Sequence, residues 1–170
     1  MKNVVWLIAD DCRPLLGAYG NAAAYTPNLD RLSDEGVTFM RAFTTIGVCG
    51  PSRASFLTGR RPDSIKVFNN VDHIRDDVRG GLNLVTIPQF FKRANFTVAG
   101  GGKIFHGPEA PPNYDAPLSW TEPFFPFRQQ HCPPTSSDGR TLGDERGAGA
   151  YCALSWDDDA FFEHQLATWG

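Results

Sequence analysis

Residues 48–61 have the sequence VCGPSRASFLTGRR, which combines a cysteine with the expected start of a helix. Pro51 suits the first turn of a helix, and Gly59 suits a position just after the last turn. Between them, apolar side chains stand among polar ones, as on a helix with one buried face. We therefore expect a helix over residues 52–60.

This helix would place Cys49 at its N-terminal end, where free backbone N–H groups and the helix dipole create a positive potential. The same geometry binds an oxyanion. Arg53, four residues further on, adds a permanent cation. These features suit a nucleophile that meets a sulfate or phosphate ester. The alternative, from these residues alone, is a small buried thiol beside an arginine that forms a surface ion pair.

A second feature lies upstream, where residues 4–9 form a continuous apolar run that ends at Asp10 and Asp11. Such a run is typical of a strand covered on both faces in a parallel sheet. Ligands of open α/β sheets gather beyond the carboxyl ends of strands, and carboxylates are hard ligands that suit Ca²⁺ or Mg²⁺. The alternative is a strand end with solvated acids, or Asp11 as a cap for the following turn.

Strands and helices alternate along the rest of the chain, which is typical of the α/β class. The expected elements are a helix over 26–36, a strand over 37–44, a helix that opens at Thr86, a strand over 96–99 and a final helix over 157–169. Thr26 is the expected cap of the first helix, and Thr86 with Gln89 matches a capping box. Glycines at 100–102 indicate a crowded or sharply turning backbone.

From residue 107 to residue 156 the sequence is rich in proline and glycine, and we expect a long loop region there. Cys132 and Cys152 bracket a polar, glycine-containing part of this region. They either close a disulfide, which would indicate an oxidising compartment, or remain free. The chain contains no C-x-x-C pair, which argues against a zinc ribbon or a thioredoxin-like redox site.

The composition limits the classes of function. A chain of 170 residues with 41% hydrophobic and 21% charged residues is large enough for one globular domain with a core. The net charge of −3 gives no reason to expect nucleic acid or an anionic membrane as a partner. The N-terminal apolar run meets two acids where a signal peptide would have small residues, so we expect no signal peptide in these residues.

Several segments, in the same order along the chain, resemble the sulfatase family. Residues 49–53 (CGPSR) followed by residues 57–60 (LTGR) resemble the sulfatase signature, in which the cysteine is oxidised to formylglycine after translation. Other segments similar to sulfatases are the acid pair at 10–11, TPNLDRL at 26–32 and GKIFH at 102–106. Segments similar to the iduronate-2-sulfatase branch are DCRP at 11–14, TGRRPD at 58–63 and TIPQ at 86–89.

This resemblance implies an alkaline-phosphatase-like α/β fold, with a mostly parallel sheet flanked by helices, of which this chain would be an incomplete part. Residues 1–170 would form the N-terminal portion of a single sulfatase catalytic domain, with 107–156 as a loop region within it. The implied reaction is hydrolysis of a sulfate ester, and the implied substrate is a sulfated carbohydrate such as 2-sulfo-iduronate. The implied location is a secretory lumen, a lysosome or the cell exterior.

The resemblance also implies that Cys49 is converted to formylglycine by a formylglycine-generating enzyme, which recognises Pro51 and Arg53. The aldehyde hydrates to a diol, and one hydroxyl attacks the sulfur and releases the alcohol. The second hydroxyl then loses its proton, sulfate is eliminated and the aldehyde returns. A plain serine would lack this second step.

By resemblance, further residues have roles around Cys49. Lys103 would bind the formylglycine and sulfate oxygens, His106 would assist proton transfer, and Arg53 would hold the formylglycine hydroxyl. Asp10 and Asp11, with the modified Cys49, would bind Ca²⁺, or less favourably Mg²⁺. The family completes this metal site from later in the chain, and no such partner is identifiable here. We therefore expect negligible turnover from these residues alone.

Two other functions remain open on the sequence alone. A related enzyme could use the same aldehyde on phosphate or phosphonate esters. Alternatively, a truncated sulfatase-like chain could keep the sugar site without the chemistry and bind sulfated carbohydrate. The state of Cys49 and a comparison of sulfate with phosphate esters would separate these possibilities.

Overall fold

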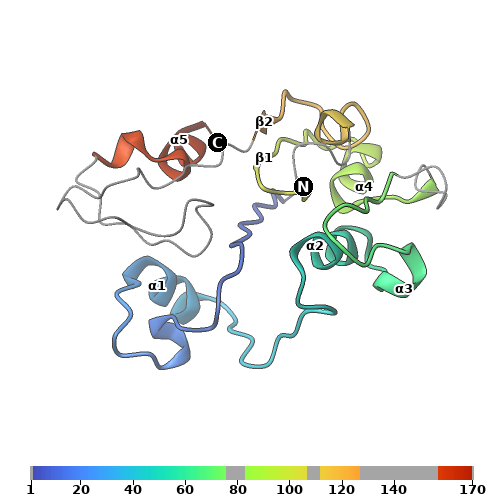
Figure 1. The fold of residues 1–170 in the computed structure, drawn as a ribbon. Helices are drawn as coiled ribbons and strands as arrows, with labels where there is room; N and C mark the ends of the chain where they lie inside the picture. The colour runs from blue at the N-terminus through green and yellow to red at the C-terminus, as the bar shows by residue number, and fades with distance from the viewer. Residues whose placement is uncertain (1, 76–82, 107–111, 127–156, 170) are drawn as a thin grey trace, which may run out of the picture.

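The computed structural model describes residues 2–75, 83–106, 112–126 and 157–169 (Figure 1). Its helical elements are η1 (Gly17–Tyr19), α1 (Pro27–Glu35), α2 (Cys49–Thr58), α3 (Pro62–Ile65), α4 (Ile87–Arg93), η4 (Pro112–Asp115), η5 (Asp158–Ala160) and α5 (Phe162–Trp169). Strands β1 (Gly101–Gly102) and β2 (Phe125–Pro126) pair in parallel, with Gly101 opposite Phe125. The described part is therefore mixed α/β with a small parallel sheet, as the predicted class requires.

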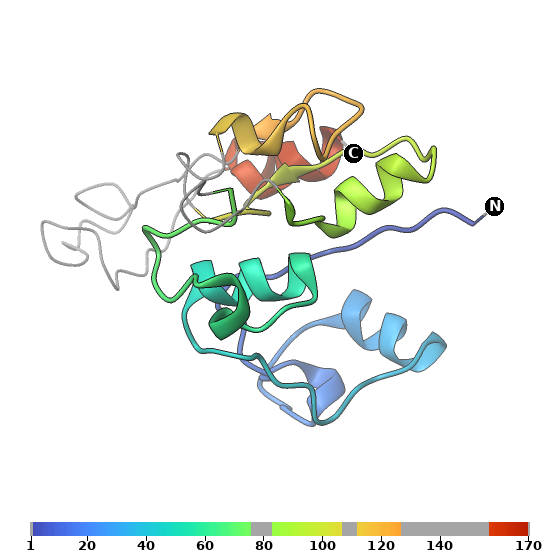
Figure 2. The same cartoon turned by 90° about the vertical axis from the view of Figure 1, so that its right-hand side faces the viewer.

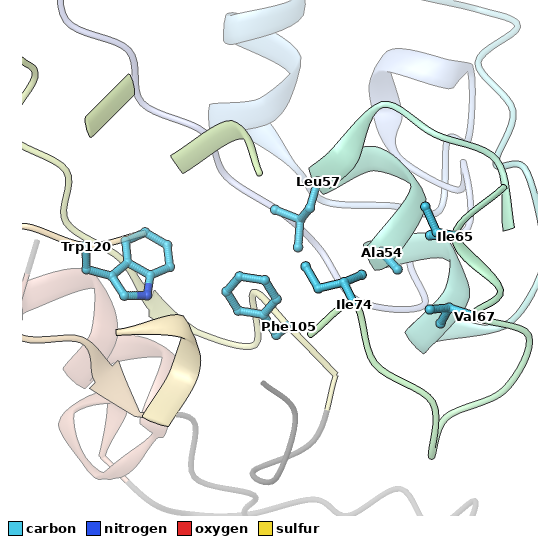
Figure 3. Close-up of a cluster of buried hydrophobic side chains, with 7 residues drawn as sticks. All are labelled: Ala54, Leu57, Ile65, Val67, Ile74, Phe105 and Trp120. Atoms are coloured by element: carbon cyan, nitrogen blue, oxygen red, sulfur yellow. The ribbon is translucent and has the colours of Figure 1, made fainter. Parts of the chain in front are cut away.

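The core of the described part lies beside α2. Its buried hydrophobic residues are Ala54, Leu57, Ile65, Val67, Ile74, Phe105 and Trp120 (Figure 3). Phe105 lies between the aliphatic group and Trp120, whose ring it meets edge-on at a centroid distance of 6.4 Å. Burial of these side chains fixes α2 and α3 against the segment that follows β1.

The strands predicted over residues 4–9 and 37–44 are not present as strands. Residues 4–9 run as an extended segment between α4 and α1 (Figure 2), and Trp6 packs edge-on against Phe56 of α2 at 5.2 Å. Other apolar side chains of these segments are exposed, with 84% of Val5 and 88% of Phe43 accessible to solvent. A strand needs a hydrogen-bonded neighbour, and neither segment has one among the described residues.

The strand predicted over 96–99 lies two residues further on, as β1 at Gly101–Gly102. The backbone before it still follows the second segment, because Val98 accepts a hydrogen bond from the Thr121 N–H at 2.9 Å. The expected crowding at the glycines is confirmed. A Cβ at Gly100 would meet the Trp120 ring at 2.4 Å, and Gly102 has a left-handed φ of 73°. Glycine satisfies the steric constraint at residue 100 and the φ constraint at residue 102, because it has no Cβ.

The predictions for helix ends were right in part. The capping box at Thr86 and Gln89 is confirmed, and α4 begins at the next residue. The helix predicted over 26–36 is confirmed as α1, but Thr26 makes no side-chain cap for it. Its hydroxyl donates to the Asp30 carboxylate and accepts from the Gly17 N–H, each at 3.0 Å, which joins η1 to α1 instead. The final helix starts later than predicted, after the short turn η5.

A buried ion pair links the segment that follows α3 to η4, and a hydrogen bond joins it to α4. Arg75 donates to both carboxylate oxygens of Asp115, at 2.7 Å and 2.8 Å, and to the side-chain oxygen of Gln89 at 3.2 Å. Asp115 also accepts a hydrogen bond from the Ser119 hydroxyl. A charge this deeply buried is tolerated only when it is paired and hydrogen-bonded, and these contacts meet that condition.

Two expectations lie outside the described residues. The possible Cys132–Cys152 disulfide does so entirely, and the loop region over 107–156 does so except for residues 112–126. Among the residues that are described, no helix is long and apolar enough to cross a membrane.

Candidate active site

The predicted helix around Cys49 begins three residues earlier than expected, so Cys49 is itself the first residue of α2. The preceding Val48 is extended, and its carbonyl accepts a hydrogen bond from the Ser52 N–H at 3.0 Å. The helix ends before Gly59, whose φ of 66° is left-handed, as expected for a C-terminal glycine. The Cys49 side chain therefore belongs to the first turn of α2, where the helix dipole is positive.

Arg53 lies one turn further along α2, on the same face as Cys49. Its side chain is buried and its guanidinium joins three parts of the chain. One nitrogen donates to the carbonyls of Lys103 and Ile104, and another donates to the Asp10 carboxylate at 2.8 Å. Arg53 thus attaches the end of the N-terminal segment and the segment after β1 to the helix of Cys49.

Lys103 and Asp10 form an ion pair in the same place. The Lys103 ammonium contacts the carboxylate oxygen of Asp10 that Arg53 does not bind. Burial alone would raise the pKa of Asp10, but the hydrogen bonds and positive charges of Lys103 and Arg53 outweigh burial and lower this pKa below its ordinary value. Asp10 is therefore a carboxylate at neutral pH.

His106 is half-buried close to this group. It lines a pocket together with Gly50, Arg53, His73 and Phe105, among others. Its Nδ1 is a buried atom with no hydrogen-bond partner among the described residues. Burial lowers the pKa of His106, and the positive charges of Lys103 and Arg53 lower it further. The imidazole is therefore neutral near pH 7 and can accept a proton.

Asp11 has an exposed side chain and a left-handed φ of 49°, which aspartate adopts more readily than most residues. With Asp10 it forms a pair of hard oxygen ligands, whose chemistry fits Ca²⁺ or Mg²⁺. The described residues contain no cluster of three or more potential metal ligands.

Sequence analysis missed one residue that contacts Cys49. The amide oxygen of Asn70 lies 3.6 Å from the Cys49 sulfur and accepts a hydrogen bond from the Gly50 N–H at 2.9 Å. Asn70 lies 21 positions after Cys49 and 20 positions after Gly50, and no motif marks it. Its signal is purely spatial, since only the path of the chain after α3 brings it to the helix.

The chain is similar to known sulfatases over most of its length. The sulfatase family model matches residues 2–140. Human iduronate 2-sulfatase is 41% identical over 132 residues, which are 76% of this chain and 23% of that protein. A sulfatase of Formosa agariphila is 30% identical over 178 residues, with 98% of this chain and 34% of that protein covered. Human arylsulfatase A is 36% identical over 112 residues, which are 63% of this chain and 22% of that protein.

The chain belongs to the sulfatase family. The mouse iduronate 2-sulfatase is 40% identical over 131 residues, so the similarity to this branch does not depend on a single relative. The chain spans 23% of the length of these iduronate 2-sulfatases. The activity and the substrate of the whole protein are therefore matters of proposal.

Proposed function

We propose that this chain contains the nucleophile-bearing part of a sulfatase that hydrolyses sulfate esters of a carbohydrate, with Cys49 as the precursor of formylglycine. One observation carries the proposal. Arg53 and Lys103, two cations, meet the carboxylate of Asp10 beside the helix whose first residue is Cys49. A helix N-terminus with adjacent cations suits a substrate that carries a negative charge.

Arg53 and Lys103 have different roles in this proposal. The Arg53 guanidinium is buried and bound to the Asp10 carboxylate and to backbone carbonyls, so it holds the parts of the site together. The Lys103 ammonium is partly exposed beside Asp10 and is available to a sulfate oxygen. A charge-assisted hydrogen bond of this kind strengthens as negative charge develops on the ester.

His106 supplies the proton transfer. Its lowered pKa keeps the imidazole neutral near pH 7. Its Nδ1 has no hydrogen-bond partner among the described residues, and the side chain lies in the wall of the pocket that Arg53 also lines. A neutral imidazole can accept the proton that the formylglycine hydroxyl loses when sulfate leaves. Formylglycine itself would supply the hydroxyl that attacks sulfur.

Asp10 and Asp11 would hold a divalent cation, Ca²⁺ in preference to Mg²⁺ because Ca²⁺ accepts more flexible oxygen ligation. Such a cation would offset the charge of the bound sulfate group. The remaining ligands would come from elsewhere in the protein. We also infer that residues 1–170 form the N-terminal portion of one catalytic domain with an alkaline-phosphatase-like fold, whose parallel sheet is larger than β1 and β2.

The substrate class is inferred from the relatives. The two mammalian relatives with the highest identities given above are named for the 2-sulfate of iduronate, so a sulfated carbohydrate such as 2-sulfo-iduronate is the proposed substrate. A formylglycine-generating enzyme is the proposed partner for maturation.

The first experiment tests the fate of Cys49. The protein is produced in an aerobic host that modifies sulfatases, and the tryptic peptide Ala42–Arg53 is analysed by mass spectrometry. We expect a mass lower by the difference between CH₂SH and CHO, with Cys49→Ala as the control that cannot be converted. An intact thiol in every preparation would contradict the proposal and favour a binding function.

The second experiment separates sulfatase from phosphatase. Matched sulfate and phosphate esters of the same sugar are given to the full-length protein, with Cys49→Ala as the control. We expect turnover of the sulfate ester that disappears in the variant. Preferential turnover of the phosphate ester would instead assign the related phosphohydrolase activity.

A further inference from the structure

The N-terminus of α2 has no cap from its own neighbouring residue. Val48 occupies the cap position and makes no side-chain hydrogen bond to the helix. Asn70 supplies the missing acceptor from a distant loop, through the 2.9 Å hydrogen bond from the Gly50 N–H to its amide oxygen. The same oxygen faces the Cys49 sulfur at 3.6 Å. One atom therefore contacts both the first turn of the helix and the side chain of the proposed nucleophile.

The loop that presents Asn70 is ordered by its own side chains. The Asn69 side-chain oxygen accepts hydrogen bonds from the N–H groups of Val71 and Asp72, both at 2.9 Å. The Asp72 carboxylate accepts another from the Phe68 N–H at 3.2 Å. The core residues Val67 and Ile74 anchor the loop on its two sides. Asn70 is thus held at a defined position rather than on a free tip.

Gly50 gives a second, independent sign of this close approach. A Cβ at position 50 would lie 2.9 Å from the Asn70 amide oxygen and 3.2 Å from the Asn69 carbonyl oxygen. Both distances are shorter than ordinary carbon–oxygen contacts. The absence of a side chain at Gly50 therefore lets the Asn70 loop come close enough to reach residue 49.

We propose that Asn70 is a positioning residue for the nucleophile, whose amide oxygen accepts a hydrogen bond from the side chain of residue 49. In the unmodified chain the donor is the thiol, and after conversion it is one hydroxyl of the hydrated aldehyde. This role rests on the proposed function. Held in this way, that hydroxyl fixes the rotamer of residue 49 and thereby the direction of the other hydroxyl.

The amide also suits an anionic substrate. Asparagine and aspartate are about equally good helix caps, so a residue that only stabilised α2 could be either. A carboxylate beside the nucleophile would repel a sulfate ester, whereas the amide oxygen accepts the same hydrogen bond without a full charge. This difference separates a positioning role from a purely structural one.

The test compares Asn70→Ala and Asn70→Asp in the full-length protein. For each variant, the formylglycine content is measured by mass spectrometry of the Ala42–Arg53 peptide. The free energy of unfolding is measured with urea, and kcat and KM are measured with the sulfate ester. We expect Asn70→Ala to lower kcat per formylglycine by about tenfold or more, with KM within about threefold. Asn70→Asp should keep the stability of the wild type and still lose kcat/KM. Thr86→Ala, which removes the cap of α4, is the control that lowers stability without changing kcat.

Wild-type kcat per formylglycine in Asn70→Ala would overturn the positioning role, whatever happens to stability. Wild-type kcat and KM in Asn70→Asp would also overturn it, because a carboxylate at that distance must affect an anionic ester. If Asn70→Ala does not fold, the aspartate variant alone decides, since it keeps the cap. An unmodified and inactive wild type would instead refute the proposed function, and the positioning role with it.

Discussion

At the scale of single residues, the candidate site is organised by charge. Arg53 is buried, and a buried guanidinium without a partner would be strongly destabilising. Asp10 compensates one side of it, and the backbone carbonyls of residues 103 and 104 compensate the other. Burial lowers the pKa of His106, and the cations that lower the pKa of Asp10 lower it further, because a positive neighbour disfavours the imidazolium.

The depressed pKa of His106 predicts how stability depends on pH. The unfolded chain keeps the ordinary value of 6.5, and the folded value is lower, so the unfolded state binds more protons as the pH falls through this range. We expect the free energy of unfolding to be highest above pH 6.5 and to decrease below it. His106→Gln should weaken this decrease. Urea unfolding at pH 7.5 and 5.5 with a chelator present measures it, and equal decreases in both proteins would contradict the assignment.

At the scale of elements, helix ends depend on which groups are near them in space. Thr86 caps α4 and is fully buried, and its hydroxyl also lies 2.9 Å from the Ser119 hydroxyl. Thr26 occupies the corresponding position directly before α1, but its hydroxyl forms hydrogen bonds with Gly17 and Asp30 instead of capping the helix. The pattern of a threonine before a first turn that contains proline predicted both helices correctly. It predicted the cap correctly at Thr86 but not at Thr26.

The buried cap of α4 predicts a cost for its removal. Thr86→Ala should lower the free energy of unfolding by about 1–2 kcal/mol, because it leaves the Gln89 N–H without its acceptor. Thr86→Ser keeps the hydroxyl and is the matched control, which should lose less. Denaturant unfolding of the two variants makes the comparison. Equal losses would mean that the Thr86 methyl group, rather than the cap, contributes the stability.

At the scale of the whole molecule, the described part has a modest core and two exposed apolar segments. The core residues gather around α2 (Figure 3), whereas most of the large apolar side chains in residues 4–9 and 37–44 are exposed. Among the described residues, the candidate cation site offers the carboxylates of Asp10 and Asp11 and no cluster of three or more potential ligands, whereas Ca²⁺ takes about six to eight oxygen ligands. Both observations agree with a chain that spans 23% of its iduronate 2-sulfatase relatives.

This small set of ligands predicts that residues 1–170 alone have no sustained turnover. The chain, with formylglycine at position 49 and Ca²⁺ present, should hydrolyse an aryl sulfate no faster than its Cys49→Ala variant. The full-length protein, assayed in parallel, should show activity that the variant lacks. Product formation by the 170-residue chain that is linear in time and in protein would contradict this prediction.

The sequence alone determined the features that depend on near neighbours. These are the helix N-terminus at Cys49, the glycine that ends α2, the capping box of α4 and the crowded glycines at 100–102, two of which form β1. Caps, left-handed turns and motifs involve residues only a few positions apart, so their chemistry is written locally. The family itself was recognisable for the same reason, because its signature is a short continuous segment.

The tertiary structure alone decided which distant residues meet. Arg53 reaches Asp10 across 43 positions, and Asn70 reaches Cys49 across 21. The sequence could not decide whether the apolar runs at 4–9 and 37–44 form strands, because a run becomes a strand only where a second strand pairs with it through hydrogen bonds. Periodicity records which side chains avoid water, whereas pairing depends on the path of the whole chain, and that path also places the acceptor that faces the proposed nucleophile.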